Sequence, residues 1–180
     1  MKTQIDYNKV YAKQLAYLEQ SPDYTILSYM NKPFKAGEKI SQYVVYTDFK
    51  PQVDSIKCYS IFVYSPFANV NKQGYPKANF QSQLLFETNV WEKKLHLTLL
   101  ETLGSESHLA FYDFQNMGLA QIALRSFINL AVRNEYRLIE GNITTFDVTS
   151  FDKIKHILNK EKFVVNANDN NYTGEFFKEL

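Results

Sequence analysis

A short run at positions 115–120, Gln-Asn-Met-Gly-Leu-Ala, has the residue types and the setting to bind an anion. A strand-like segment, residues 109–114, comes just before it, and a helical pattern starts near Gly118. The first N–H groups of a helix have no partner within the helix and lie at the positive end of its dipole. Gly118 has no Cβ to keep a phosphate from the backbone, and the small Ala120 allows the first turn to lie close to a sheet. The run therefore predicts a phosphate or pyrophosphate site; the alternative is an ordinary strand-to-helix turn that binds no ligand.

Two pairs of carboxylate and imidazole side chains could supply a general base near this run. If residues 104–105 form a two-residue hairpin turn, Glu101 faces His108 across the two strands. The same register places His96 opposite Asp113. Glu101 is our candidate for the catalytic base, because an amine is mostly ammonium at neutral pH and must lose a proton before it attacks. A solvated cross-strand pair without a chemical role is the alternative.

The other reactive side chains do not suggest a metal site or a thiol nucleophile. The three histidines are far apart in the sequence, and none has a cysteine or a second histidine at the spacing of a metal site. Cys58 lies in an aromatic, strand-like segment, so we expect it to be a small buried core residue.

The composition limits the classes of protein that fit. The chain has 180 residues, enough for one domain with a core, and its 20 basic and 19 acidic side chains give a net charge of +1. Proteins that hold nucleic acid by electrostatics are usually strongly basic, so we expect neither a nucleic-acid partner nor an anionic membrane. A single cysteine cannot form an internal disulfide, and no apolar run reaches the roughly 20 residues of a membrane span. With no apolar signal segment at the start, we expect a soluble cytoplasmic protein.

Hydrophobic periodicity predicts the elements that must hold these residues in place. Helices are expected where apolar residues recur every three or four positions, and strands where β-branched and aromatic residues gather. The expected helices cover residues 6–20, 118–134 and a segment opening at 149; the expected strands cover residues 40–46, 55–64, 80–86, 95–103, 109–114 and 138–146, with a closing hairpin at 163–166 and 172–178. This order predicts a single domain of the α/β or α+β class, with a mixed, mostly antiparallel sheet flanked by helices.

The run at 115–120 resembles a known signature. Gln115-x-x-Gly118-x-Ala120 fits the Gln/Arg-x-x-Gly-x-Gly/Ala pattern of the GCN5-related N-acetyltransferases, whose corresponding loop binds the pyrophosphate of acetyl-CoA. The elements that follow, through Gly141 and the closing segment after Gly174, resemble the last elements of that family. The resemblance covers residues 108–180 and implies an acyl-CoA N-acyltransferase-like domain, with residues 108–180 as the acyl-CoA-binding half and residues 1–107 as a divergent, substrate-side half.

The resemblance implies a set of ligand contacts. Acetyl-CoA or another acyl-CoA would be the cosubstrate, with the thioester arm beside the strand-like segment and a backbone N–H there donating to the acyl oxygen. The acceptor, a small-molecule or peptide amine, would enter through the N-terminal strands and the loop at residues 65–79. The implied cofactor contacts are Ala110, Phe111, Gln115, Asn116, Met117, Gly118, Leu119 and Ala120.

One departure from the family pattern sets up a second hypothesis. Many members carry a tyrosine that protonates the leaving thiolate, followed by a Gly-Phe pair, and here Leu158 and Lys162-Phe163 take these places. Either another group or water supplies that proton, or the chain is a catalytically inactive binding or regulatory protein with the same fold, for which a homodimer is a candidate assembly. A third alternative is a nucleic-acid accessory protein that stacks bases on the aromatic strands, against which the neutral charge argues.

Overall fold

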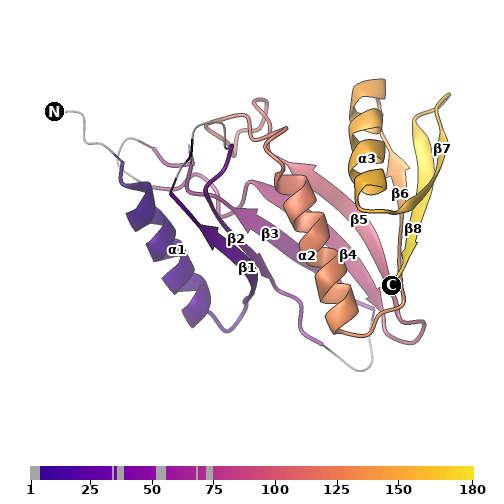
Figure 1. Ribbon diagram of the computed structural model, residues 1–180, viewed down its shortest axis with the longest axis horizontal. Coiled ribbons are helices and arrows are strands. Elements are labelled where there is room, and N and C mark those ends of the chain that lie inside the picture. The colour runs from indigo at the N-terminus through magenta and orange to yellow at the C-terminus, as the bar shows by residue number, and fades with distance from the viewer. Residues whose placement is uncertain (1–4, 34, 36–38, 52–55, 68, 72–74) are drawn as a thin grey trace.

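The strands of this protein form one sheet with three helices packed against it (Figure 1). The computed structural model describes residues 5–33, 35, 39–51, 56–67, 69–71 and 75–180. Along these residues the helices are α1 (Tyr7–Gln20), α2 (Leu119–Arg133) and α3 (Val148–Lys160), and the strands are β1 (Thr25–Asn31), β2 (Gln42–Thr47), β3 (Cys58–Tyr64), β4 (Ser82–Asn89), β5 (Lys94–Thr102), β6 (Leu138–Thr144), β7 (Val164–Asn168) and β8 (Thr173–Glu179).

The strand order is β1-β2-β3-β4-β5-β6-β8-β7. Every neighbouring pair is antiparallel except β5 and β6, which run parallel because the chain crosses over through α2 between them. The prediction of a single mixed domain with a mostly antiparallel sheet flanked by helices is confirmed.

The helices cover both faces of the sheet. Val44 on β2 packs in a small core with Tyr11 of α1, while the next residue, Val45, belongs to the main core together with Phe127 of α2. Successive strand residues point to opposite faces, so α1 and α2 lie on opposite sides. Phe151 of α3 belongs to the main core as well, so α3 lies on the α2 side.

The helix predicted from the apolar periodicity of residues 118–134 is confirmed as α2. Its apolar stripe is buried, and the ring of Phe127 lies 4.9 Å from that of Phe86 on β4. This packing holds the helix against the centre of the sheet and thereby fixes where its N-terminus lies. In the described part of the chain, the helices fall short of the length and apolar character that a membrane crossing needs.

The predicted strand at residues 109–114 and the predicted hairpin turn at residues 104–105 are wrong. After Thr102 the chain forms a series of turns up to Gly118. β5 pairs with β4 along its length and with β6 over residues 94–97, and residues 109–114 join neither ladder. Their backbone forms local hydrogen bonds instead. The Ser107 carbonyl accepts from the Ala110 N–H, and the Ser107 hydroxyl accepts from the Leu109 N–H.

Strand β1 was not predicted. It is an edge strand whose side chains are mostly exposed or half-buried, and the polar Thr25, Ser28 and Asn31 interrupt its apolar residues. Because an edge strand buries little of either face, its sequence carries a weak pattern.

Gly141 marks the end of the parallel pairing between β5 and β6. A Cβ at this position would lie 2.7 Å from the carbonyl oxygen of Leu97 and would collide with the buried ring of Phe176. We predict that Gly141→Ala lowers the free energy of unfolding by about 1–3 kcal/mol, the usual cost of overpacking, in urea denaturation. Asn142→Ala, an exposed neighbour on the same strand, is the control and should stay within about 0.5 kcal/mol of wild type. Equal stabilities for the two variants would contradict the tight contact.

Candidate functional site

The parallel strands β5 and β6 separate before either of them ends. Their register stops at the pair Leu97 and Gly141, whereas β5 continues to Thr102 and β6 to Thr144. Figure 1 shows the two strands diverging toward their carboxyl ends. Past the last pair, the backbone groups on that edge of β5 have no partner in β6. They are therefore able to hydrogen-bond an extended ligand.

A β-bulge lies at the point of separation. Leu85 of β4 pairs with Leu99, and the next residue, Phe86, pairs with Leu97, so Thr98 is an extra residue in β5. A bulge bends its strand and increases the local twist. The bend directs the second half of β5 away from β6 and leaves the backbone of residues 98–100 beside the opening between the strands.

The N-terminus of α2 has no capping side chain. Gly118, its N-cap, has φ 86° and ψ 6°, and Asn116 has φ 61°, so both are left-handed. The first intrahelical bond runs from the Ile122 N–H to the Gly118 carbonyl at 3.1 Å, and the N–H groups of residues 119–121 precede it. Left-handed turns that bring successive N–H groups together form anion-binding concavities. We call residues 116–121 the cradle.

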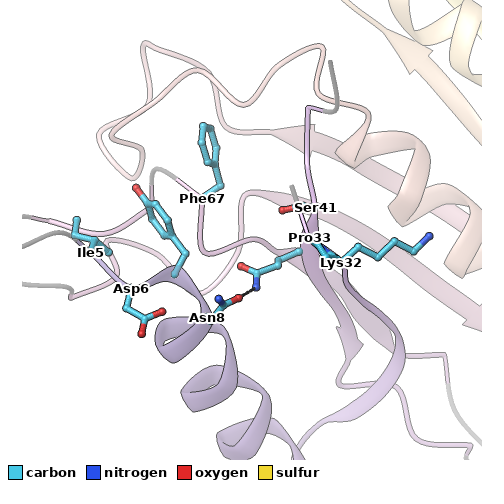
Figure 2. A pocket seen from close by; sticks show the side chains of 9 residues that line it. Ile5, Asp6, Asn8, Lys32, Pro33, Ser41 and Phe67 are labelled. Atoms are coloured by element: carbon cyan, nitrogen blue, oxygen red, sulfur yellow. Dashed lines mark hydrogen bonds between the residues drawn. The ribbon is translucent and has the colours of Figure 1, made fainter. Parts of the chain in front are cut away.

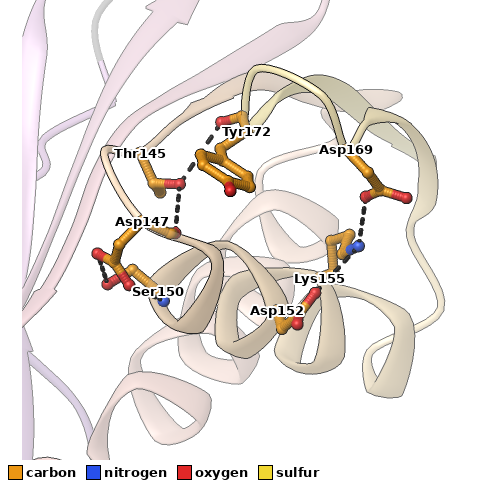
Figure 3. Close-up of polar contacts among 7 residues, drawn as sticks. All are labelled: Thr145, Asp147, Ser150, Asp152, Lys155, Asp169 and Tyr172. Carbon is orange, nitrogen blue, oxygen red and sulfur yellow. Dashed lines mark hydrogen bonds and ion pairs between the residues drawn. The ribbon is translucent and has the colours of Figure 1, made fainter.

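The N-termini of the other two helices are capped by carboxylates. Asp6 caps α1 by accepting from the Lys9 N–H, and Asp147 caps α3 by accepting from the Ser150 N–H at 2.8 Å (Figure 3). The Ser150 hydroxyl also donates to Asp147, at 2.8 Å, and these two bonds hold the pKa of Asp147 below its ordinary value. A carboxylate already occupies the anion position at both of these helix N-termini, so the cradle at α2 is the better candidate. The capping residue of α3 is thus Asp147, and the helix begins at Val148, one residue before the predicted start at 149.

Lys39 brings a positive charge to the cradle. Its ammonium donates to the Asn116 carbonyl at 2.7 Å, across 77 positions of sequence. The contact depends on the path of the chain before β2, so no local sequence signal could have identified it. A cation beside open N–H groups adds to the attraction for a phosphate group.

Some of the predicted cofactor residues expose backbone groups to a ligand, and others have side chains that pack in the protein core. Leu119 is buried in the main core and Met117 packs against it, so they could contact a ligand through their backbone. Ala120, half-buried in the first turn, offers its N–H. The Gln115 N–H donates to the Asp113 carboxylate at 2.9 Å, and its side chain extends toward Glu106.

Ala110 and Phe111 lie outside the strand that was meant to position them. The Lys77 ammonium donates to the Ala110 carbonyl at 3.1 Å and lies 4.6 Å from the centre of the Phe111 ring. The strand next to the opening is β5, whose backbone beyond Leu97 borders it. A cofactor contact at Ala110 or Phe111 stays a prediction.

The predicted pairings of Glu101 with His108 and of His96 with Asp113 are wrong. Because β5 pairs with β4, Glu101 lies opposite Gln83, and its carboxylate is exposed. His96 lies between Glu87 of β4 and Glu140 of β6 on the same row of the sheet. Glu101 remains the carboxylate on β5 beyond the point of separation, so it is still the candidate base.

Leu158 cannot supply a proton. It is 2% exposed and packs in the main core. The end of α3 is held to α2 by Glu161, whose carboxylate accepts from Gln121 at 2.6 Å and from Arg125 at 2.8 Å. Where many members of the family carry a tyrosine, this chain therefore has Leu158, a buried apolar residue near a helix end that is held in place.

Cys58 is exposed at the start of β3, contrary to the expectation of a buried core residue. Only this first residue of the strand is exposed, whereas Tyr59, Ser60 and Ile61 are buried. Partial desolvation and the nearby Glu87 carboxylate raise the pKa of the Cys58 thiol, which disfavours a nucleophilic role. Among the described residues, no cluster of His, Cys, Asp and Glu could hold a metal ion.

A cavity of about 660 Å³ lies at the N-terminus of α1, where Asp6, Lys32, Ser41 and Phe67 line it (Figure 2). Gln42, buried in its wall, donates to the side-chain oxygens of Asn8 and Asn31. The side-chain amide of Gln42 therefore already donates to two partners within the protein.

Comparison with solved structures finds similar folds among acetyltransferases. An acetyltransferase from Bacillus cereus ATCC 14579 is 17% identical, with 69% of this chain and 74% of that chain covered and a TM-score of 0.45. A putative acetyltransferase of the GNAT family from Desulfovibrio desulfuricans is 11% identical, with 68% of each chain covered and a TM-score of 0.46. Nourseothricin acetyltransferase is 8% identical, with 93% of each chain covered and a TM-score of 0.45.

No protein-family model and no curated protein matches the sequence. At such identities and TM-scores, the likeness to the solved structures transfers no activity, substrate or site residue to this chain. The candidate site therefore rests on the geometry of the cradle and of the separated strands.

The left-handed backbone conformation of Gly118 leads to a prediction about the stability of variants at this position. A Cβ there would meet no atom within 4 Å, so the only cost of Gly118→Ala is the backbone conformation, about 1–2 kcal/mol for an L-residue. We predict destabilisation of this size in urea denaturation, and a smaller loss for Gly118→Asn because asparagine tolerates the left-handed region better. Stabilisation by alanine, the usual result at a glycine with negative φ, would contradict the described cradle.

Proposed function

We propose that this protein is an acyl-CoA-dependent N-acyltransferase that acts on an amine. The observation that supports this best is the combination of two open hydrogen-bonding surfaces, the uncapped, left-handed N-terminus of α2 and the unpaired edge of β5 past Leu97. An acyl-CoA has a pyrophosphate for the first surface and, in its pantetheine arm, amides for the second. The similar folds among acetyltransferases agree with this assignment without carrying it.

Each part of the chain has a role in the proposed site. The N–H groups of residues 119–121 hold the pyrophosphate, and Lys39 adds a positive charge beside it. A backbone N–H within residues 98–100 that faces the opening donates to the acyl oxygen and stabilises the charge that develops there. Acyl-CoA supplies an activated acyl group whose thiolate is a good leaving group.

Glu101 is the proposed general base. Its carboxylate takes a proton from the acceptor ammonium, and the free amine then forms a C–N bond to the acyl carbon while the C–S bond breaks. The amine nitrogen loses its second proton as the amide forms, and the thiolate takes up one proton from water. Water has this role because Leu158 has no proton to give. Balanced over the reaction, one ammonium and one thioester give one amide, one thiol and one released proton.

The cosubstrate assignment is tested by binding. We predict that acetyl-CoA binds in isothermal titration calorimetry and that Gly118→Val, which puts a branched side chain at the cradle, weakens binding at least 10-fold. Ser105→Val is the control, because Ser105 is exposed in the turn region before the cradle, and it should bind like wild type. No binding at millimolar acetyl-CoA would overturn the assignment.

Lys39 provides a second, independent test at the cradle. Lys39→Ala should weaken acetyl-CoA binding by about 2- to 5-fold, the value of an exposed ionic contact, and the difference should shrink in high salt. Lys57→Ala, at the opposite end of the sheet where β3 begins, should have no effect. A loss for Lys57→Ala equal to that for Lys39→Ala would indicate nonspecific attraction instead of a site.

Catalysis is tested at Glu101. Glu101→Gln should lower kcat by about 10²- to 10⁴-fold while leaving the Kd for acetyl-CoA unchanged, since a base acts on the acceptor. An unchanged kcat would exclude Glu101 as the base.

A catalytically inactive binding or regulatory protein is the second candidate, and the buried Leu158 is the observation that favours it. Acetyl-CoA binding without acyl transfer to any member of a panel of amines would support this candidate over the enzyme. A homodimer and a cytoplasmic location remain proposals for either candidate.

A further inference from the structure

A cavity of about 310 Å³ lies between α1 and the sheet, on the face opposite α2. Half of the residues that line it are aromatic. The rings belong to Tyr17 of α1, Tyr24, Tyr46 of β2, Phe62 of β3 and Phe80. The volume is at the lower end of the range for small-molecule sites and suits a ligand with one ring and a short chain.

The aromatic walls are held in fixed positions. Tyr24 meets Tyr46 edge-on with ring centres 5.2 Å apart, and Tyr46 stacks on Phe62 at 5.1 Å. The Tyr46 hydroxyl donates to the Asn79 carbonyl at 2.7 Å, and burial raises the pKa of Tyr46, so this phenol stays neutral. Rings in such arrangements offer both faces and edges to another ring.

A buried polar group in the wall lacks a partner. The side-chain nitrogen Nε2 of Gln14 is buried, lines the cavity and has no hydrogen-bond partner among the described residues. Buried amide groups are nearly always hydrogen-bonded. Because Nε2 donates, Gln14 favours a ligand that carries an acceptor on its apolar end, and the oxygen of a ring hydroxyl is such an acceptor.

The cavity lies in line with the proposed base. Phe62 of β3 is opposite Gln83 of β4, and Gln83 is opposite Glu101 of β5, so the three residues form one row on one face of the sheet. Two strand spacings separate the ends of the row, or about 10 Å. A ring in the cavity with an ethylamine chain would therefore extend its amine toward Glu101.

The positive charge of Lys77 limits which amines the cavity can accept. Lys77 lines the cavity, and its ammonium is held by the Ala110 carbonyl and the Phe111 ring. A second positive charge inside the cavity would be repelled by Lys77. This disfavours a polyamine and favours an acceptor with a single amine at the end away from its ring.

We propose that this aromatic cavity binds the ring of an arylalkylamine acceptor that has a hydroxyl group on the ring, with the amine directed toward Glu101. The proposal rests on the proposed function for the role of the amine. The cavity itself can be tested without acyl-CoA.

The test compares three amines of the same chain length by calorimetry on the full chain: tyramine, phenethylamine and 2-cyclohexylethylamine. We expect phenethylamine to bind about 2- to 10-fold tighter than 2-cyclohexylethylamine because of its ring contacts. Tyramine should bind a further 2- to 10-fold tighter because its hydroxyl meets Gln14. Equal affinities for all three amines, no binding, or tighter binding of a peptide that begins with tyrosine would overturn the proposal.

Two variants locate the binding. Gln14→Leu should remove the preference for tyramine over phenethylamine and keep the preference for the aromatic ring. Ala78→Trp, which fills the cavity from its wall, should abolish binding of all three amines. Tyr29→Ala, exposed on β1 and outside the cavity, is the control. Unchanged binding in Ala78→Trp would overturn the proposal even if Gln14→Leu fails to fold.

An acyl-transfer assay distinguishes a failure of the cavity assignment from a failure of the proposed function on which it rests. Tyramine binding without acyl transfer would leave the cavity assigned and would count against the enzyme. Acyl transfer to aliphatic amines but not to tyramine would support the enzyme and overturn the cavity assignment.

Discussion

The short parallel pairing between β5 and β6 is the constraint on which the site depends. The register joins residues 94–97 of one strand to residues 138–141 of the other, in a sheet that is otherwise antiparallel. A parallel neighbour requires a crossover, and α2 provides it, so the start of α2 must lie near the end of β5. The bulge at Thr98 then bends β5 away from β6. One topological choice thus produces both an unpaired strand edge and a helix N-terminus beside it.

The packing of α2 makes this arrangement rigid. Phe127 and its neighbours hold the helix against β4, and Glu161 links α2 to the end of α3. The cradle therefore lies on a fixed helix, although its own residues adopt left-handed backbone. The opposite face of the sheet, under α1, has its own small core and the aromatic cavity. Because strands are common to both faces, a row of residues across β3, β4 and β5 connects the cavity with Glu101.

Structural features that depend on local sequence pattern could be predicted from the sequence, and features that depend on strand register could not. The period of α2 and the glycine that precedes it identify the cradle, because both features lie within a few consecutive residues. Lys39 contacts Asn116 only because of the fold, and the bulge at Thr98 exists only relative to its partner strand. Residues 109–114 have strand-like composition because Leu109 lines the aromatic cavity and Phe114 is buried, so their apolar character reflects packing instead of pairing. The predicted pairings of Glu101 and His96 required a strand at residues 109–114, so they are wrong for the same reason.

Amide chemical-shift mapping by NMR with acetyl-CoA is the most direct test of the central claim, that the opening beside β5 and the N-terminus of α2 form one ligand site. We expect the largest shifts at the amides of residues 98–100 and 118–121, with little change at the capped N-terminus of α3, residues 148–150. Large shifts at residues 148–150 with none in the cradle, or no shifts at saturating concentration, would contradict the account.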